Sequence, residues 1–246
     1  MKTFAIDCKS GISGDMFVGA LLDLTDREDY LRTELAKTSI VNEFKINIGT
    51  IKKNGVLAIK FDVLFEESHH HRKIEDIFQI IGKGSIKQSA KTLAKNIFLN
   101  LGKAEAKAHR TNLKNLHFHE IGAIDSLVDI ISFSILFSAL NINRIICTKV
   151  PTGKGKIKCA HGILNLPIPA TKHLLKGIPA YKSNINSELV TPTGAAILRT
   201  ISPIFYEKIE KIRYSRKGIG AGTKDFKELP NVLEIFFSND NFCSQR

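Results

Sequence analysis

Residues 4–24 read FAIDCKSGISGDMFVGALLDL, an apolar run, a turn rich in glycine and serine, and a second apolar run. The first run, Phe4–Cys8, is short and largely apolar, which predicts a buried strand. The second run, Met16–Leu24, has the length and composition of a buried helix. The chain therefore passes from a strand into a helix through the turn at residues 9–15.

This turn places Asp7 at the carboxyl end of the strand and Asp15 near the start of the helix. The backbone N–H groups around Ser13 and Gly14 could bind a phosphate, and the two carboxylates could hold a divalent cation. The turn is not a Walker A loop, because no Gly-Lys-Ser/Thr is present. The alternative is an ordinary turn in which Ser13 caps the helix and Asp15 complements its dipole.

The rest of the chain alternates irregularly between strands and helices. Alternating apolar residues around Asn54-Gly55 predict a β-hairpin over residues 44–65. Helices are predicted over residues 74–81, 86–109, 125–140, 169–175 and 195–201, the last capped by Thr193, and strands over 116–120, 144–150, 209–214 and 231–237. We expect a mixed α/β (α+β) fold, a sheet with interspersed helices and an N-terminal β-hairpin, without strict βαβ alternation.

The composition excludes several classes of protein. Of the 246 residues, 43% are hydrophobic, too many for a disordered chain and enough for a substantial core. The longest uncharged apolar stretch, residues 130–143, has 14 residues, and a bilayer span needs roughly 18. No signal peptide is expected at the N-terminus. The four cysteines form no C-x-x-C pair, which favours reduced thiols in the cytoplasm.

The positive charge is concentrated in the C-terminal half. The formal net charge of the chain is +12, of which the first 125 residues contribute +3 and the rest +9. This asymmetry indicates an anionic partner, either a nucleic acid or a phosphorylated small molecule. Nucleic acid is the weaker interpretation, because the basic residues lack interleaved aromatic residues and tryptophan is absent.

Two histidine blocks could bind a metal ion. The run His69-His70-His71 is the densest, and imidazole is a good ligand for nickel, zinc and copper. The stretch 117–120, His-Phe-His-Glu, puts His117 and His119 on one face of a predicted strand, with Glu120 at its end and Asp125 on the next helix. This arrangement resembles a metal site or an acid–base pair. A solvated loop and buried, hydrogen-bonded histidines are the respective alternatives.

A third candidate follows in the basic half. Lys154, Lys156 and Lys158 alternate along one strand face, which suits a phosphate or carboxylate ligand, or simply the solvated face of an edge strand. Cys159 and His161 share a face and could bind a borderline metal.

The glycine-rich run 218–222 does not fit a dinucleotide-binding loop, because no helix follows it. We expect instead a glycine-rich turn that brings the backbone close to a ligand.

Taken together, these blocks resemble the LarC family, the nickel-insertion proteins of nickel-pincer cofactor synthesis. The blocks that carry the resemblance are Asp7 with residues 10–16, residues 70–72, 117–126, 159–162, 188–196 and 218–223, in family order. The resemblance covers residues 1–237 as one region, with two subdomains dividing near 68–115 as the alternative, and a polar tail at 238–246. It also implies a further C-terminal portion, associated with CTP and Mg²⁺ or Mn²⁺, that this chain does not contain.

The resemblance implies a function: a nickel-inserting lyase (cyclometallase) that acts on pyridinium-3,5-bisthiocarboxylate mononucleotide, consumes CTP and supplies enzymes of the lactate racemase type. It implies a cytoplasmic homo-oligomer that needs the C-terminal portion and binds neither nucleic acid nor membrane. A non-catalytic nickel-delivery subunit and a divalent-metal nucleotide phosphohydrolase are the alternatives.

The candidate residues fall into three groups. The expected nickel ligands are His69, His70, His71, His117, His119, Cys159 and His161. The expected ligand-binding residues are Asp7, Ser13, Gly14, Asp15, Lys154, Lys156, Lys158, Thr191, Thr193, Gly220 and Gly222. Since a carbon–nickel bond requires removal of a ring proton, Glu120 and His119 are the expected bases, with Asp125 orienting an imidazole.

Overall fold

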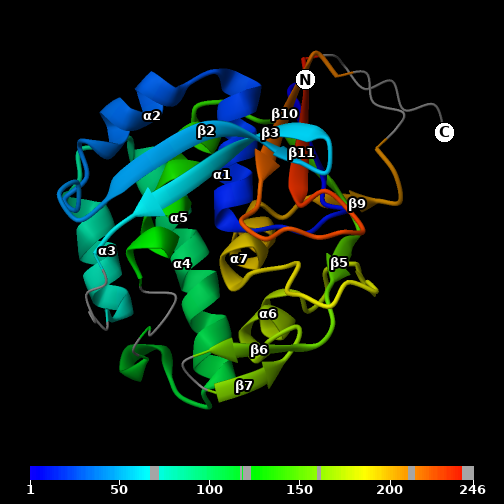
Figure 1. Ribbon diagram of the computed structural model, residues 1–246. Helices are drawn as coiled ribbons and strands as arrows, with labels where there is room; N and C mark the ends of the chain where they lie inside the picture. Colours follow the sequence, from blue (N-terminus) through cyan, green and yellow to red (C-terminus); the bar gives the residue numbers. More distant parts are fainter. Residues whose placement is uncertain (67–71, 117, 119–122, 160–161, 210–213, 240–246) are drawn as a thin grey trace.

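The computed structural model describes residues 1–66, 72–116, 118, 123–159, 162–209 and 214–239. Figure 1 shows the chain coloured from the N-terminus to the C-terminus. The helices are α1 (Gly14–Thr25), α2 (Glu28–Leu35), α3 (Ile74–Lys83), α4 (Gln88–Ala108), α5 (Ile124–Ser138), α6 (Pro169–Leu174) and α7 (Pro192–Ile201), with a 3₁₀ turn η1 (Leu113–Asn115). The strands are β1 (Thr3–Asp7), β2 (Lys45–Lys53), β3 (Val56–Leu64), β4 (Arg144–Thr148), β5 (Val150–Thr152), β6 (Lys156–Cys159), β7 (Gly162–Asn165), β8 (Ala180–Lys182), β9 (Ile204–Tyr206), β10 (Arg216–Ala221) and β11 (Val232–Ser238).

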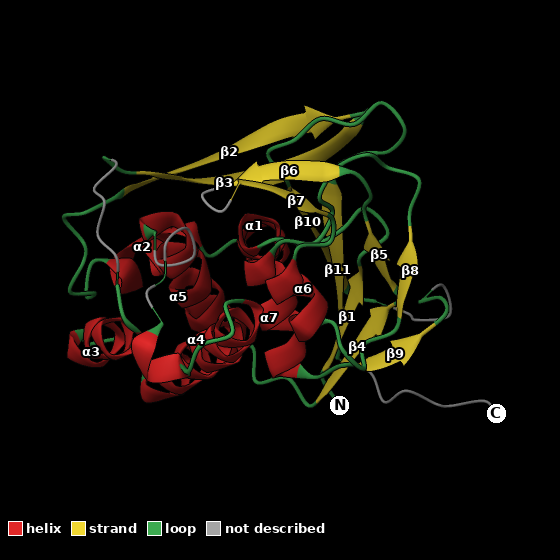
Figure 2. Ribbon diagram, turned by 90° about the horizontal axis from the view of Figure 1, so that it is seen from below, coloured by secondary structure: helices red, strands yellow, loops and turns green. Residues whose placement is uncertain are grey.

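A seven-stranded mixed sheet with the order β2-β3-β10-β11-β1-β4-β9 forms the backbone of the fold. Strands β3 and β10, β1 and β4, and β4 and β9 pair in parallel, and the other neighbours are antiparallel. Figure 2 shows the helices gathered on one face of this curved sheet. Two small two-stranded sheets, β5-β8 and β6-β7, complete the described part of the chain.

Helix α1 packs against the sheet because two glycines of β10 leave room for it. A Cβ atom at Gly220 would lie 1.9 Å from the carbonyl oxygen of Met16, and one at Gly218 would lie 2.1 Å from that of Ala20. Behind α1, Phe17 makes an edge contact with Phe133 of α5, with the ring centroids 5.4 Å apart. This close packing fixes where the N-terminus of α1 points.

The predicted fold class and most elements are confirmed. The first strand, the first helix, the β-hairpin and the long buried helix at α5 lie where the sequence predicts them. Asn54 and Gly55 both have positive φ, as a tight hairpin turn of this kind requires.

Three details of the sequence prediction are wrong or only partly covered by the described residues. The last helix begins at Pro192, and its cap is Thr191 rather than Thr193. The run 218–222 is not a turn, because residues 218–221 belong to strand β10. Of the predicted strand 116–120, Phe118 forms one isolated bridge with Arg72, and residues 117, 119 and 120 lie outside the description, as do 210–213 of the predicted strand 209–214.

Candidate functional site

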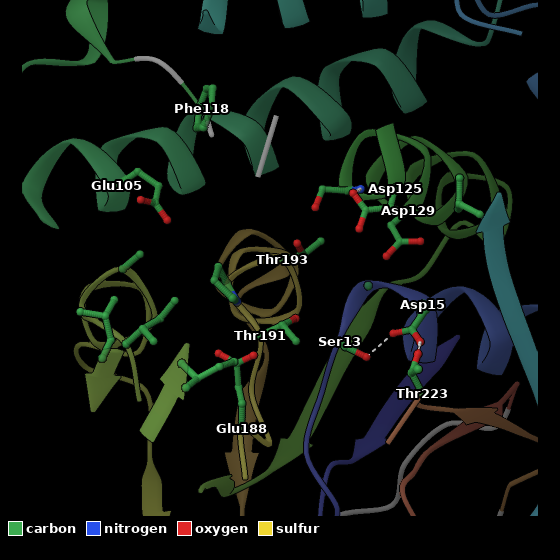
Figure 3. Close-up of a pocket in the computed structure, with 18 of the residues that line it drawn as sticks. Ser13, Asp15, Glu105, Phe118, Asp125, Asp129, Glu188, Thr191, Thr193 and Thr223 are labelled. Carbon is green, nitrogen blue, oxygen red and sulfur yellow. Dashed lines mark hydrogen bonds between the residues drawn. The ribbon is translucent and has the colours of Figure 1, made fainter. Parts of the chain in front are cut away.

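A cavity of about 640 Å³ opens where the N-termini of helices α1, α5, α6 and α7 meet. Strand β3, the end of α4, the β6-β7 hairpin and the segments around Leu116, Phe118, Glu188 and Thr223 supply further lining residues. Figure 3 shows the polar residues that face this space. Since each of these helix ends comes from a different part of the sequence, the cavity forms only in the complete fold.

The N-termini of α1 and α7 are held side by side by backbone contacts. The Ile12 N–H donates to Leu189 O at 2.8 Å, and the Thr191 N–H donates to Ile12 O at 3.1 Å. Gly11 permits this approach: its φ is +106°, and a Cβ there would lie 2.0 Å from Leu189 O. The glycine-rich turn after β1 and the Val-Thr-Pro-Thr-Gly run at the start of α7 are therefore held together by backbone hydrogen bonds.

Asp15 is the centre of the polar network on this wall. Its carboxylate accepts hydrogen bonds from the Ser13 hydroxyl, from Thr223 Oγ1 at 3.4 Å, and from the Lys60 ammonium at 2.8 Å. Lys60 also lies 2.8 Å from the carboxylate of Asp62. Burial lowers the pKa of Lys60, but Asp15 and Asp62 outweigh burial and raise it overall, so the side chain is a fixed cation.

Two further carboxylates lie on the first turns of α5. Burial, followed by the negative charges of Asp15 and Asp125, raises the pKa of Asp129 well above its ordinary value. Burial also raises the pKa of Asp125, although solvent reaches it through the cavity, and its carboxylate accepts the Ser126 N–H at 2.7 Å. The carboxylate of Asp129 accepts the backbone N–H of Asp15, so a residue of α5 caps α1.

The described lining of the cavity is mainly acidic on its polar side. Its carboxylates belong to Asp15, Asp62, Glu105, Asp125, Asp129 and Glu188, and its one lysine is Lys60. Much of the remaining lining is apolar and is formed by Phe65, Leu116, Phe118, Ile157, Leu164 and Ile168. Such a cavity suits a ligand that is partly flat and apolar and that carries or accompanies positive charge.

His109 is a lining residue that the sequence analysis did not identify. It is the C-cap of α4, and its Nε2 lies 3.4 Å from the carboxylate of Glu105, which also lines the cavity. The signal in the sequence was the position of an imidazole at the end of a long helix, where it is favoured by the helix dipole.

Comparison with known proteins identifies the family. The family model described as "Nickel insertion protein" matches residues 4–246. The chain belongs to the nickel insertion protein family. The resemblance seen in the sequence motifs is thus confirmed.

Three relatives carry the name pyridinium-3,5-bisthiocarboxylic acid mononucleotide nickel insertion protein. The one from Geobacillus kaustophilus is 39% identical over 98% of this chain and 60% of its own length. The one from Staphylococcus epidermidis strain RP62A is 40% identical over 99% of this chain and 61% of its own length. The one from Desulfitobacterium hafniense strain DCB-2 is 41% identical over 96% of this chain and 58% of its own length. The chain thus spans about 60% of the length of the curated relatives it matches.

No solved structure matches the chain. Within the described residues, no helix is both long and apolar enough to cross a membrane.

The structure brings together part of the residue set predicted for this nickel insertion family chain. Ser13, Gly14, Asp15, Asp125, Thr191 and Thr193 all line the cavity. His69, His70, His71, His117, His119, Glu120 and His161 lie outside the described residues, as does the side chain of Cys159. Among the described residues, no group of three or more histidine, cysteine or acidic side chains could hold a metal ion.

Other predicted ligand-binding residues lie away from the cavity. Asp7 is paired with Lys9 at 2.7 Å and does not join Asp15, so the structure does not assemble the predicted two-carboxylate cation site. Lys156 and Lys158 are exposed and alternate with Ile157, which faces the cavity, and Lys154 is exposed as well.

Gly220 and Gly222 are not lining residues either. Gly220 packs against α1, and a Cβ at Gly222 would lie 2.5 Å from the Asn231 side chain. In the structure these glycines have packing contacts instead of a place at the cavity.

Proposed function

We propose that this chain binds Ni²⁺ and pyridinium-3,5-bisthiocarboxylate mononucleotide and takes part in inserting the metal into that substrate. The three relatives above are named for this substrate, and the chain matches them over nearly its whole length. The reaction replaces a ring C–H bond with a carbon–nickel bond: the bonding electron pair goes to nickel, and the proton goes to a base. Nickel is a substrate here and keeps its oxidation state.

One observation carries the proposal: Arg72 and Phe118 are paired at the cavity. The Phe118 N–H donates to Arg72 O at 3.1 Å, and Phe118 is buried and lines the cavity. Arg72 directly follows the run 69–71 in sequence, and Phe118 separates His117 from His119. The described residues next to the two histidine-rich blocks, Arg72 and Phe118, are therefore paired with each other, which supports our proposal of a shared role of the blocks in nickel capture.

The lining of the cavity supports the substrate as well. A pyridinium ring is flat and positively charged. The apolar wall at Phe65 and Phe118 suits a flat ring, and the carboxylates on α1 and α5 suit its charge. We propose Glu120 and His119 as bases for the ring proton, and Asp125 as an orienting carboxylate at the same cavity.

The remaining parts of the proposal concern the whole reaction. We propose a cyclometallase-type lyase activity in the cytoplasm, in which CTP with Mg²⁺ or Mn²⁺ is used by a C-terminal portion of the family. The product would serve enzymes of the lactate racemase type, and the chain would act as a homo-oligomer.

Reconstitution tests this proposal directly. The chain is incubated with Ni²⁺, CTP and the precursor mononucleotide, with and without the separately expressed C-terminal portion, and the product is identified by mass spectrometry. We expect the nickel-containing product only when both portions are present. Failure to form it with both portions, although nickel binds, would favour a delivery subunit without turnover. Phosphate release from a nucleotide without nickel or precursor would favour a phosphohydrolase.

A further inference from the structure

We propose that His109, oriented by Glu105, takes up the proton that the substrate ring loses and releases it to solvent. This inference rests on the proposed function and extends it. Glu120 and His119 are proposed above as the groups that remove the proton from the ring, and His109 gives that proton a way out of the cavity. The electron pair of the broken C–H bond goes to nickel, so this step moves only a proton and needs no oxidant or reductant.

His109 lies where the cavity meets solvent. It is the one histidine among the described residues that line the cavity. Its side chain is 31% exposed, whereas that of Glu105 is 13% exposed. Imidazole readily accepts and releases a proton near neutral pH. A group that carries a proton from the cavity to water must reach both, and the position of His109 meets this condition.

Glu105 holds His109 through the backbone and the side chain. The His109 N–H donates to Glu105 O at 2.8 Å, and the imidazole Nε2 lies 3.4 Å from the Glu105 carboxylate. A carboxylate beside an imidazole fixes its orientation and stabilises its protonated form. His109 is also the C-cap of α4, where the helix dipole favours positive charge. Both features stabilise the imidazolium that forms when the proton arrives.

The Glu105–His109 pair shares a face of α4 with the aromatic part of the cavity wall. Gly102, Glu105 and His109 are spaced three and four residues apart, which places them on one side of a helix. A Cβ added at Gly102 would lie 3.2 Å from Phe118 Cζ, so the Phe118 ring packs on this side of α4. In Figure 3, Glu105 projects from α4 toward the cavity that Phe118 also lines. The pair therefore lies on the side of the cavity where the flat ring of the substrate is proposed to bind.

The reconstituted reaction tests this role when it is run with and without 2,6-lutidine, a base whose methyl groups hinder binding to nickel. We expect His109→Ala to slow product formation by about 100-fold, because acid–base groups contribute on this order. Since the side chain of His109 is partly exposed, lutidine should reach the vacated place and restore much of the lost rate. The unchanged protein should respond little to lutidine.

Further variants separate the imidazole from its carboxylate partner. His109→Gln keeps much of the side-chain volume but cannot take up a proton, so it should be as slow as His109→Ala. Glu105→Gln keeps the shape and removes the charge beside the imidazole, and it should slow product formation by about tenfold. Glu75→Gln and His173→Ala, at exposed positions of α3 and α6, are the matched controls and should keep the full rate.

Calorimetry with Ni²⁺ and with the precursor distinguishes proton transfer from a structural role, because the variants of Glu105 and His109 should bind both as tightly as the unchanged protein. Three results would overturn the role of His109 and leave the proposed function in place: full activity in a folded His109→Gln protein, a slow variant that lutidine does not accelerate, or a loss of ligand binding that parallels the loss of rate. Absence of product with the unchanged protein and the C-terminal portion would overturn both.

Discussion

The Lys60 ammonium lies 2.8 Å from the Asp15 carboxylate and joins strand β3 to the first turn of helix α1 at the wall of the cavity. Lys60 is 8% exposed, so its charge is compensated mainly by Asp15 and Asp62. The same ion pair therefore belongs to the cavity wall and connects strand β3 to helix α1.

Replacing Lys60 with methionine should destabilise the protein by about 2 kcal/mol at pH 7, because two carboxylates lose their partner. This figure is below the usual cost for a fully buried pair, since Asp62 is partly exposed and solvent screens it. Because the folded state raises the pKa of Lys60, its contribution is complete below about pH 10 and is lost as the pH rises further. Urea unfolding measures the effect, with Lys52→Met, at an exposed position of β2, as control. Equal stability of the two variants would contradict the prediction.

Asp129→Asn should change the pH dependence of stability. The raised native pKa of Asp129 means that its ionised form is disfavoured in the folded protein, so the carboxylate reduces stability as the pH rises from about 4 through the native pKa. The asparagine variant does not lose stability in this way, because its side chain does not ionise. Its side-chain oxygen can still accept a hydrogen bond from the Asp15 N–H. In thermal unfolding between pH 4 and 8, the unfolding temperature of the variant relative to that of the unchanged protein should increase with pH. A constant difference across this range would show that Asp129 does not titrate there.

Gly220→Ala should destabilise the fold by about 2–4 kcal/mol, because the added methyl group would meet the backbone of α1 1.9 Å away. Gly49→Ala, in β2, is the matched control, since its Cβ would have no neighbour within 4 Å. Denaturant unfolding of both variants measures the effect. If Gly220→Ala were as stable as the control but bound the mononucleotide poorly, the ligand-binding role predicted from the sequence would be restored.

Replacing His69, His70 and His71 together with alanine should weaken Ni²⁺ binding by about tenfold or more, because imidazole ligands dominate nickel affinity. Calorimetry with NiCl₂ measures this, and His173→Ala, at an exposed position of α6, is the control. Unchanged nickel binding in the triple variant would transfer the role to His117 and His119.

Glu120→Gln should leave folding and nickel binding nearly unchanged and suppress product formation in the reconstituted reaction. The amide keeps the shape of the side chain and removes the oxygen that accepts a proton. The product is quantified by mass spectrometry. Full activity would remove Glu120 from the chemistry.

Much of the fold could be predicted because periodicity and turn chemistry are local. The Asn54-Gly55 hairpin and the long apolar helix α5 follow from neighbouring residues alone. The β10 strand was misread because its glycines signal a turn locally, whereas their cause is the distant helix α1. The cap at Thr191 was missed in favour of Thr193, although Pro192 at the first helical position marks the helix start.

The candidate site was harder to predict than the fold. Lys60 stands between Ile59 and Phe61 in an alternating strand, and its role depends on Asp15, 45 residues away in sequence. The lysines of 154–158 form the conspicuous charge pattern, yet they are exposed, and the isolated lysine is the one that lines the cavity. Sequence spacing gives no measure of such contacts, because they are created by the packing of α1 against β3.

The hydrogen bond between Thr223 and Asp15 joins residues 208 positions apart. During synthesis, Asp15 leaves the ribosome long before Thr223 is added. The part of the cavity wall that is made first is therefore completed only when Thr223 has been made. Until then the carboxylates of α1 and α5 lack their complete surroundings. A growing chain consequently has the complete Asp15 network at the cavity wall only after translation has passed Thr223, so a ligand that depends on this network can bind only after that point.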